Sequence, residues 1–334
     1  MGGAGGLGYP CAMTASPQAI ALGELLIDFV PEENGRSLAD ARAFVKAPGG
    51  APANVAVGLA RLGIDAGFMG KVGDDPFGHF LTDVLSDNGV DIGQVVFDAQ
   101  ARTALAFVSL TSSGERDFLF YRHPSADMRY RPDEVSDAYI AGASVLHIGS
   151  ISLIQETSRS ATLRALDLAA EHGLWVSYDA NLRLPLWPSP DAAREGIRSV
   201  WRRAHVVKIS EDELEFLTGA RDMAAARTLR HDALRLLVVT RGDAGAWYLT
   251  RQGEGEVGGF RVDTVDTTGA GDAFTAALLA SLIENHALEK TRDALEAALR
   301  RANAYAALTT TRRGAIPALP SRDALEAFLA EHDD

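Results

Sequence analysis

The chain has 334 residues, 47% of them hydrophobic, and a formal net charge of −13 at pH 7. An excess of carboxylates repels polyanions, so we expect neither a nucleic acid nor a membrane surface as a partner. No apolar run reaches the roughly 18 residues of a membrane-spanning helix, and the composition is typical of a soluble globular protein.

Residues 1–17 are predicted to form a flexible tail. A Gly-x-Gly-x-x-Gly pattern begins at Gly3, but no strand precedes it and no helix pattern follows, so a dinucleotide-binding turn is not expected. The tail lacks the basic and apolar regions of a signal peptide, and Met13 is an alternative start. Cys11 is the only cysteine, which excludes an intrachain disulfide and favours a reducing, cytoplasmic location.

From residue 19 onward, short apolar runs alternate with helical patterns. The first strand pattern covers 19–30, and later ones cover 66–72, 144–148, 174–178, 206–209 and 236–240. Helical patterns follow four of the later strands, at 76–88, 157–171, 192–202 and 211–217. This alternation predicts right-handed crossovers and an α/β fold whose largely parallel sheet is flanked by helices.

Two segments interrupt the alternation. Residues 95–110 and 117–121 are predicted to be strands joined by a polar turn at 111–116. A hairpin inside an α/β chain indicates a small sheet that projects from the main one. Because no linker rich in glycine or proline divides the body, we expect one domain, 18–334, that carries this sheet as a lid.

A glycine pair, Gly49 and Gly50, precedes a helical pattern that ends at Gly63. Pro52 suits the first turn of that helix. Asn54 lies one turn into it, so its amide can point back over the glycines, and an amide offers both a donor and an acceptor to a sugar hydroxyl. By itself the segment predicts only a junction between a strand, a turn and a helix.

The segment Asp-Thr-Thr-Gly-Ala-Gly-Asp before the apolar run 273–283 predicts an anion site. Gly269, Ala270 and Gly271 are expected to turn into a helix whose first N–H groups and dipole favour an anion. In the first turn the dipole keeps Asp272 ionised, so that it can accept the proton of an attacking hydroxyl while the N–H groups stabilise a moving phosphoryl group. The alternative interpretation is an ordinary first-turn acid.

Together the two glycine motifs resemble the ribokinase, or phosphofructokinase-B, family of sugar kinases. The resemblance covers about 19–319, and the segments 23–29, 120–128 and 179–183 resemble its fructokinase branch. It implies a ribokinase-like three-layer fold with a β lid formed by about 24–46 and 95–122. In many relatives such a lid also forms a homodimer contact, which we expect here.

The resemblance also assigns a sugar side to the site. Asp28 follows an apolar strand pattern, and ligands of open α/β sheets bind beyond the carboxyl ends of strands; its alternative role is to cap a turn. The remaining sugar-side candidates are Gly49, Gly50, Asn54, Arg122 and Phe107. A place in the hydrophobic core explains Phe107 equally well.

On the phosphate side, the resemblance implies contacts to ATP from Arg183, Lys208, Thr240, Gly242, Gly245, Gly271 and Asn303. Glu213 takes the position of a glutamate that organises Mg²⁺ through water, although an acidic helix start without metal explains it too. Asp266 and Thr268 resemble a monovalent-cation site that favours K⁺. A structural salt bridge remains the alternative role of Arg122 and Arg183. None of the histidines shows the spacing of metal ligands.

The function implied is ATP-dependent phosphorylation of D-fructose at its 6-hydroxyl, with Asp272 as the base. The nearest alternative is a 2-keto-3-deoxygluconate kinase, because Arg122 and Arg183 suit a substrate carboxylate. Ribose and nucleosides are less favoured substrates. A sugar-sensing relative without turnover needs no base beside an anion site, and a nicotinamide dehydrogenase lacks its dinucleotide motif.

Overall fold

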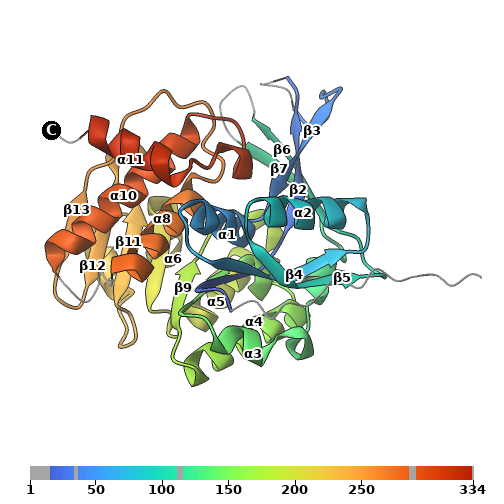
Figure 1. Cartoon of the computed structure of the whole chain (residues 1–334), viewed down its shortest axis with the longest axis horizontal. Coiled ribbons are helices and arrows are strands. Elements are labelled where there is room, and N and C mark those ends of the chain that lie inside the picture. Colours follow the sequence, from blue (N-terminus) through green and yellow to red (C-terminus); the bar gives the residue numbers. More distant parts are fainter. Residues whose placement is uncertain (1–15, 34–36, 111–115, 286–290, 333–334) are drawn as a thin grey trace, which may run out of the picture.

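The computed structural model describes residues 16–33, 37–110, 116–285 and 291–332, which carry two sheets (Figure 1). The larger sheet has nine strands. In spatial order they are β13 (Glu254–Val257), β12 (Ala246–Thr250), β11 (Leu236–Thr240), β10 (Val206–Ser210), β9 (Trp175–Asp179), β8 (Val145–Gly149), β1 (Ala19–Leu22), β4 (Ala66–Gly73) and β5 (Asp91–Asp98). The strands from β11 to β5 are parallel, while β12 and β13 are antiparallel.

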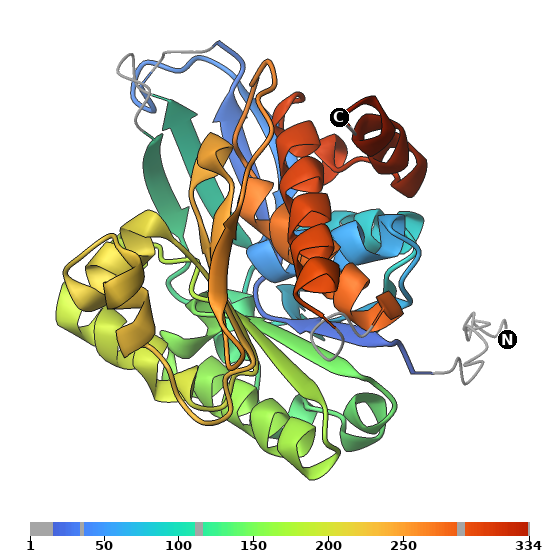
Figure 2. The ribbon, with the colours of Figure 1, turned by 90° about the vertical axis from the view of Figure 1, so that its left-hand side faces the viewer.

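Helices cover both faces of this sheet, as Figure 2 shows. One face packs on α1 (Ala51–Arg61), α2 (Pro76–Asp87), α8 (Ala270–Asn285), α10 (Arg292–Thr310) and α11 (Arg322–Glu331). The other packs on α3 (Asp137–Ala141), α4 (Glu156–Glu171), α5 (Pro190–Trp201), α6 (Glu211–Thr218) and α7 (Met223–Thr228). Successive strand residues enter opposite cores, for example Ala19 and Ile20, because side chains alternate across a strand. The predicted three-layer α/β fold is confirmed.

Local signals fix the helix boundaries. Asp75 caps α2 by accepting hydrogen bonds from the backbone N–H groups of Phe77 and Gly78, and Pro76 opens the helix. Gly63, with a φ of 80°, follows the end of α1 as predicted. The helices α2, α4, α5 and α6 accordingly occupy the four helical patterns seen in the sequence.

The second sheet contains β3 (Phe44–Gly49), β2 (Leu26–Pro31), β6 (Ala104–Leu110) and β7 (Arg116–Tyr121), in that order. It projects beside the main sheet and is the predicted lid (Figure 1). The predicted tail, apart from residues 16–17, and the predicted turn at 111–116, apart from Arg116, lie outside the described residues.

Two strand predictions were wrong in their extent. The apolar run 19–30 is two strands: β1 pairs with β4 and β8 in the main sheet, whereas β2 pairs with β3 and β6 in the lid. Residues 95–98 likewise belong to β5 of the main sheet, and the lid resumes only at Ala104. The first crossing is hidden in the sequence because Leu22 and Leu25, on either side of it, are both buried and apolar.

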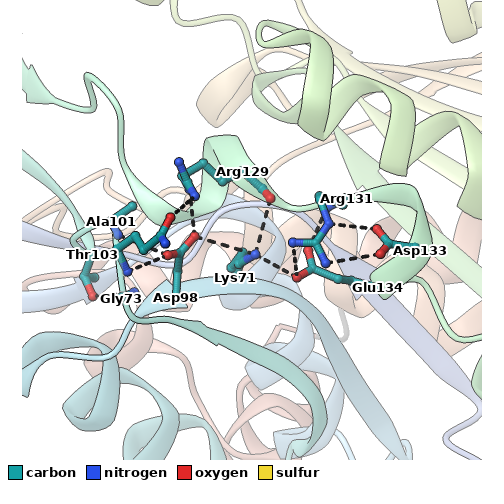
Figure 3. A network of polar contacts seen from close by, with 10 residues as sticks. Lys71, Gly73, Asp98, Ala101, Thr103, Arg129, Arg131, Asp133 and Glu134 are labelled. Carbon is teal, nitrogen blue, oxygen red and sulfur yellow. Dashed lines mark hydrogen bonds and ion pairs between the residues drawn. The ribbon is translucent and has the colours of Figure 1, made fainter.

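A polar network fastens the edge of the main sheet to the segment that follows the lid (Figure 3). Lys71 of β4 lies 2.7 Å from Glu134 and 3.6 Å from Asp98. Burial alone would raise the pKa of Asp98, but hydrogen bonds from the Gln100 N–H and Arg129, with the charge of Lys71, lower it to about 2. This buried ion cluster fixes where the chain returns from the lid.

The order in which the chain adds strands to the sheet reverses between β1 and β8, although the two strands are parallel. The chain continues from β1 to β4 and β5 on one side, while β8, β9, β10 and β11 follow one another on the other side. Ligands of open α/β sheets bind beyond the carboxyl ends of the strands at such a reversal. Among the described helices, none combines the length and apolarity that crossing a membrane requires.

Candidate active site

An open cavity of about 100 Å³ lies between the lid and the carboxyl ends of the main strands. Its lid wall contains Leu26, Asp28, Val30, Val108 and Phe120, and its floor contains Glu24, Gly50, Ala51, Asn54, Ile151, Asn181, Arg183, Thr268, Gly269 and Asp272. A larger hollow of about 480 Å³ lies at the amino ends of β8, β9 and β10 and contains none of the predicted site residues. The smaller cavity is therefore the candidate site.

Asp272 is a buried carboxylate of the floor that two amide side chains contact. It lies in the first turn of α8, which begins at Ala270, and is only 8% exposed. Asn54 donates its amide to one carboxylate oxygen (2.7 Å), and Asn181 donates to the other (3.4 Å). Burial raises the pKa of Asp272 to about 6, although the hydrogen bond from Asn54 opposes the shift. The dipole argument for full ionisation was therefore incomplete, because desolvation acts against it.

The predicted glycine turn is present. Gly269 has a φ of 77°, in the left-handed region that glycine tolerates, and a Cβ there would lie 2.7 Å from that of Ala315. The Ala270 N–H already donates to the Thr267 carbonyl at 3.3 Å. A Cβ on Gly271 would lie 2.8 Å from the Lys208 ammonium nitrogen, so the missing side chain leaves room for that cation.

A buried ion pair supports the floor beside Gly271. The Lys208 ammonium lies 3.0 Å from an Asp179 carboxylate oxygen, and both side chains are buried. Burial disfavours the charged lysine, but the carboxylates of Asp179 and Glu213 outweigh it, so the pKa of Lys208 is raised. Arg183 lines the cavity from above the same strand ends, and its charge lowers the pKa of Asp272.

Glu213 is held by backbone groups. Its carboxylate accepts the N–H of Leu182 (2.6 Å) and that of Ser210 (2.7 Å), while the Ser210 hydroxyl accepts the Glu213 N–H. This is a capping box at the start of α6. Burial raises the pKa of Glu213. The geometry supports the alternative in which Glu213 begins a helix, and it leaves only an indirect role at a metal.

Asp266 and Thr268 lie together as predicted. One Asp266 oxygen accepts the backbone N–H (2.9 Å) and hydroxyl (2.7 Å) of Thr268, and the other accepts the Gly314 N–H at 2.9 Å. The carboxylate thus ties the turn before α8 to the segment after α10. The part of the chain that the structure describes contains no group of three or more acidic, histidine or cysteine side chains placed to hold a metal.

Of the predicted nucleotide residues, Arg183 lines the cavity, whereas Thr240, Gly242, Gly245 and Asn303 do not. Thr240 ends β11, while Gly242 and Gly245 have φ angles of 59° and 89° in the turn that follows. Asn303 of α10 donates to the carbonyls of Gly258 (3.0 Å) and Val257 (3.3 Å). The amide of Asn303 therefore fastens the end of β13 to α10.

The lid wall requires a correction. Phe107 stacks on Phe29 with ring centroids 5.0 Å apart, on the face opposite the cavity. Phe120 lines the cavity instead. Phe120 pairs with Ala106 across the strands, one position away from Phe107, and a shift of one residue reverses the face of a strand.

Asp28 and Arg122 also differ from their predicted settings. Asp28 lies inside β2 of the lid, not at the end of a main strand, and its carboxylate occupies the space where Gly49 would carry a side chain. Arg122 is buried and donates to Asp127 with its Nε at 3.1 Å and with a second guanidinium nitrogen. Arg122 does not line the cavity.

Sequence reasoning assigned no role to Glu24 and Asn181 of the cavity floor, nor to Asp179, which accepts the Asn181 N–H. Glu24 lies two residues beyond β1, Asp179 ends β9, and Asn181 lies two residues beyond Asp179. Glu24 accepts the Ala51 N–H at 3.1 Å, and burial raises its pKa to about 7. The rule that ligands bind beyond strand ends selects Asp179 and Asn181 from the predicted strand 174–178, and it selects Glu24 once the end of β1 is placed at Leu22. In the sequence analysis the rule was applied to Asp28.

Comparisons with known proteins agree with this geometry. The model of the pfkB family carbohydrate kinases matches residues 16–322. The chain is 53% identical to probable fructokinase-4 of Arabidopsis thaliana over 93% of this chain and 96% of that one. Fructokinase from Xylella fastidiosa with bound ATP has a TM-score of 0.87 and 34% identity, covering 95% of this chain and 100% of that one. A fructokinase double mutant from Vibrio cholerae, in its fructose, ADP and potassium ion bound form, has a TM-score of 0.83 and 37% identity over 94% and 99% of the two chains.

Proposed function

The chain belongs to the pfkB family of carbohydrate kinases, and we propose that it is a fructokinase that transfers the γ-phosphoryl group of ATP to the 6-hydroxyl of D-fructose. The observation that carries the proposal is the Asp272 carboxylate, held by Asn54 beside the glycine turn of α8 and facing the cavity. The similarity to fructokinases, including one with bound ATP, supports the choice of substrates.

In this reaction Asp272 accepts the proton of the 6-hydroxyl as the hydroxyl oxygen bonds to the γ-phosphorus. The bond between the γ-phosphorus and the bridging oxygen breaks, and that oxygen leaves on ADP. A pKa of about 6 leaves Asp272 mostly ionised at neutral pH, yet basic enough to take the proton. Asp28, Gly50 and Asn54 would hold the remaining hydroxyls of the sugar.

The phosphate side would use the positive groups of the floor. Arg183 lines the cavity, and Lys208 lies against Gly271 at the start of α8. Together with the backbone N–H groups of the Gly269–Gly271 turn they offset the charge of the transferred group. Thr240, Gly242, Gly245 and Asn303 would contact the rest of the nucleotide.

Two cations complete the proposal. When bound, Mg²⁺ neutralises charge on the phosphates of ATP. Because backbone groups occupy both Glu213 oxygens, Glu213 fits Mg²⁺ only through water, which suits an ion that keeps several waters. Asp266 and Thr268 would support a K⁺ site, as the potassium-bound form of the Vibrio fructokinase suggests. Replacing K⁺ by choline should then lower turnover.

The decisive experiment measures ADP release with fructose, ribose and 2-keto-3-deoxygluconate. We expect the highest kcat/KM for fructose, since Arg122 is paired with Asp127 and does not face the cavity. If the keto acid were the substrate, Arg122→Met would damage its kcat/KM selectively. If the wild type has a higher kcat/KM for the keto acid than for fructose, the substrate assignment is wrong and the kinase assignment stands.

We also propose a homodimer formed through the lid. Leu119 and Tyr121 of β7 are 48% and 59% exposed. They share the face of the lid that carries Phe107, opposite the cavity. Apolar side chains gathered on one face of a small sheet suit a contact with a second copy. Light scattering after size exclusion tests the proposal, and a monomer at micromolar concentration contradicts it.

A further inference from the structure

Asn181 has an unusual backbone conformation. Its φ of 38° is the only positive value at a non-glycine residue in the described part of the chain. Asparagine tolerates this region better than other side chains, but glycine would adopt it more easily. The presence of a side chain here therefore calls for an explanation, which the contacts of the amide supply.

Asp179 holds this conformation from one side. Its carboxylate accepts the Asn181 backbone N–H at 3.1 Å and the Lys208 ammonium at 3.0 Å. The hydroxyl of Thr275, one turn beyond Asp272 in α8, lies 3.5 Å from the same carboxylate. Asp179 is 2% exposed, so these contacts are shielded from water.

The side chain of Asn181 points to the base. Its amide nitrogen lies 3.4 Å from the Asp272 oxygen that Asn54 leaves free, and Asn181 lines the cavity. The two amides approach the carboxylate from different elements, since Asn54 belongs to α1 and Asn181 follows β9. Contacts of this kind are often long in a site without substrate and tighten during the reaction.

We propose that Asn181 is a positioning residue for the base and that Asp179 holds Asn181 in the conformation this role requires. The inference rests on the proposed kinase function and deepens it. The two amides fix the plane of the Asp272 carboxylate and favour its ionised form, because donors to a carboxylate stabilise the charge. A purely structural Asn181 would serve only the turn after β9.

Other charges bear on the same carboxylate and are constant across the variants below. Asp179 in β9 raises the pKa of Asp272, while Lys208 in β10 and Arg183 after β9 lower it. Glu24 after β1 and Asp28 in β2 line the same cavity, and Glu213 in α6 acts on Lys208. None of these charged groups changes in the experiment.

The experiment compares Asn181→Gly with Asn181→Ala. Glycine keeps the left-handed backbone and removes the amide, whereas alanine removes the amide and strains the backbone. We expect both variants to lose about tenfold in kcat, the lower end for a hydrogen bond to a charged group. The acid limb of the kcat profile should move to higher pH in both. Only Asn181→Ala should also unfold at a lower temperature.

A second measurement separates this inference from the kinase assignment. Carboxyl ¹³C NMR of Asp272 in the free enzyme reports its pKa without sugar or ATP, and we expect a higher pKa in Asn181→Gly than in the wild type. An unchanged pKa together with a wild-type kcat in Asn181→Gly would overturn the inference. If the wild type phosphorylates no sugar, the proposed function fails, and the NMR comparison still decides the role of Asn181.

Discussion

The floor and the lid wall of the cavity are built in opposite ways. The floor and the ion pair that supports it concentrate charge: Asp179, Lys208 and Asp272 are 2%, 7% and 8% exposed. The lid wall is a single sheet whose small core contains Leu26, Ala104 and Ala106, and its Val30 is 40% exposed. Burying an ion costs several kcal/mol unless it is paired, so the floor persists only as a connected network.

The contrast indicates that the chemistry resides in the floor and the selectivity in the lid wall. Fixed charges and amides in a buried floor need no rearrangement when a phosphoryl group moves, which is the condition for electrostatic stabilisation. Apart from Asp28, the lid wall offers apolar contact and shape. We therefore expect substitutions in the floor to lower kcat, and substitutions in the lid wall to raise KM. Four predictions test that division.

Asp272→Asn should produce the largest effect. An amide cannot accept the hydroxyl proton, and a single positioned base contributes about 10² to 10⁴-fold. We expect kcat to fall by that factor in an ADP-release assay, while calorimetric affinities for fructose and ATP stay within a few fold. Activity within tenfold of the wild type would remove Asp272 from the mechanism.

Gly271→Val should rank second. A Cβ there lies 2.8 Å from the Lys208 ammonium, so a branched side chain displaces the cation and blocks the backbone approach to the phosphate. Loss of one hydrogen-bond donor to the transferred phosphoryl group raises the activation free energy by roughly 3 kcal/mol, which lowers kcat about 10²-fold. Gly253→Val is the matched control, because a Cβ at Gly253 meets no atom within 4 Å. Equal losses in the two variants would contradict the role of the turn.

The pH profile should show a smaller, graded effect. The base must be ionised, and burial raises the pKa of Asp272 to about 6. We therefore expect kcat/KM to be constant above this pH and to fall about tenfold per unit below it. Glu24, with a pKa of about 7, lines the same cavity, so Glu24→Gln is the control. If the fall in kcat/KM at low pH disappears in Glu24→Gln, the titrating group is Glu24 and not Asp272.

The lid pair should give the smallest effect. Phe120→Ala removes an apolar contact from the cavity wall, and we expect the KM for fructose to rise about tenfold, since burying such a side chain is worth roughly 1.5 kcal/mol or more. Phe107→Ala should leave KM within twofold and lower the melting temperature instead, because its ring packs on Phe29 and Tyr121. Equal rises in KM in the two variants would contradict the assignment of Phe120, and not Phe107, to the cavity face of the lid.

Several local features of the protein could be predicted from the sequence. The helices α2, α4, α5 and α6 lie within two residues of their predicted bounds, and side-chain caps from Asp75, Ser189 and Ser210 begin α2, α5 and α6. The turn at Gly269–Gly271 and the pair Gly49 and Gly50 were also predicted, because a positive φ or a close approach leaves a glycine in the sequence. Such signals depend on residues that are neighbours in the chain and need no contact with a distant segment.

Which distant segments and side chains contact one another follows from the tertiary structure. The runs 19–30 and 95–110 each divide between two sheets, because strand pairing with distant segments, not apolar composition, assigns a strand to its sheet. Phe120 replaced Phe107 because register sets the face of a strand. Asn54 and Asp272 are 218 residues apart, and Asn181 completes their contact from a third element. The orientation of the base is a property of the packed sheet and helices, which no local pattern encodes.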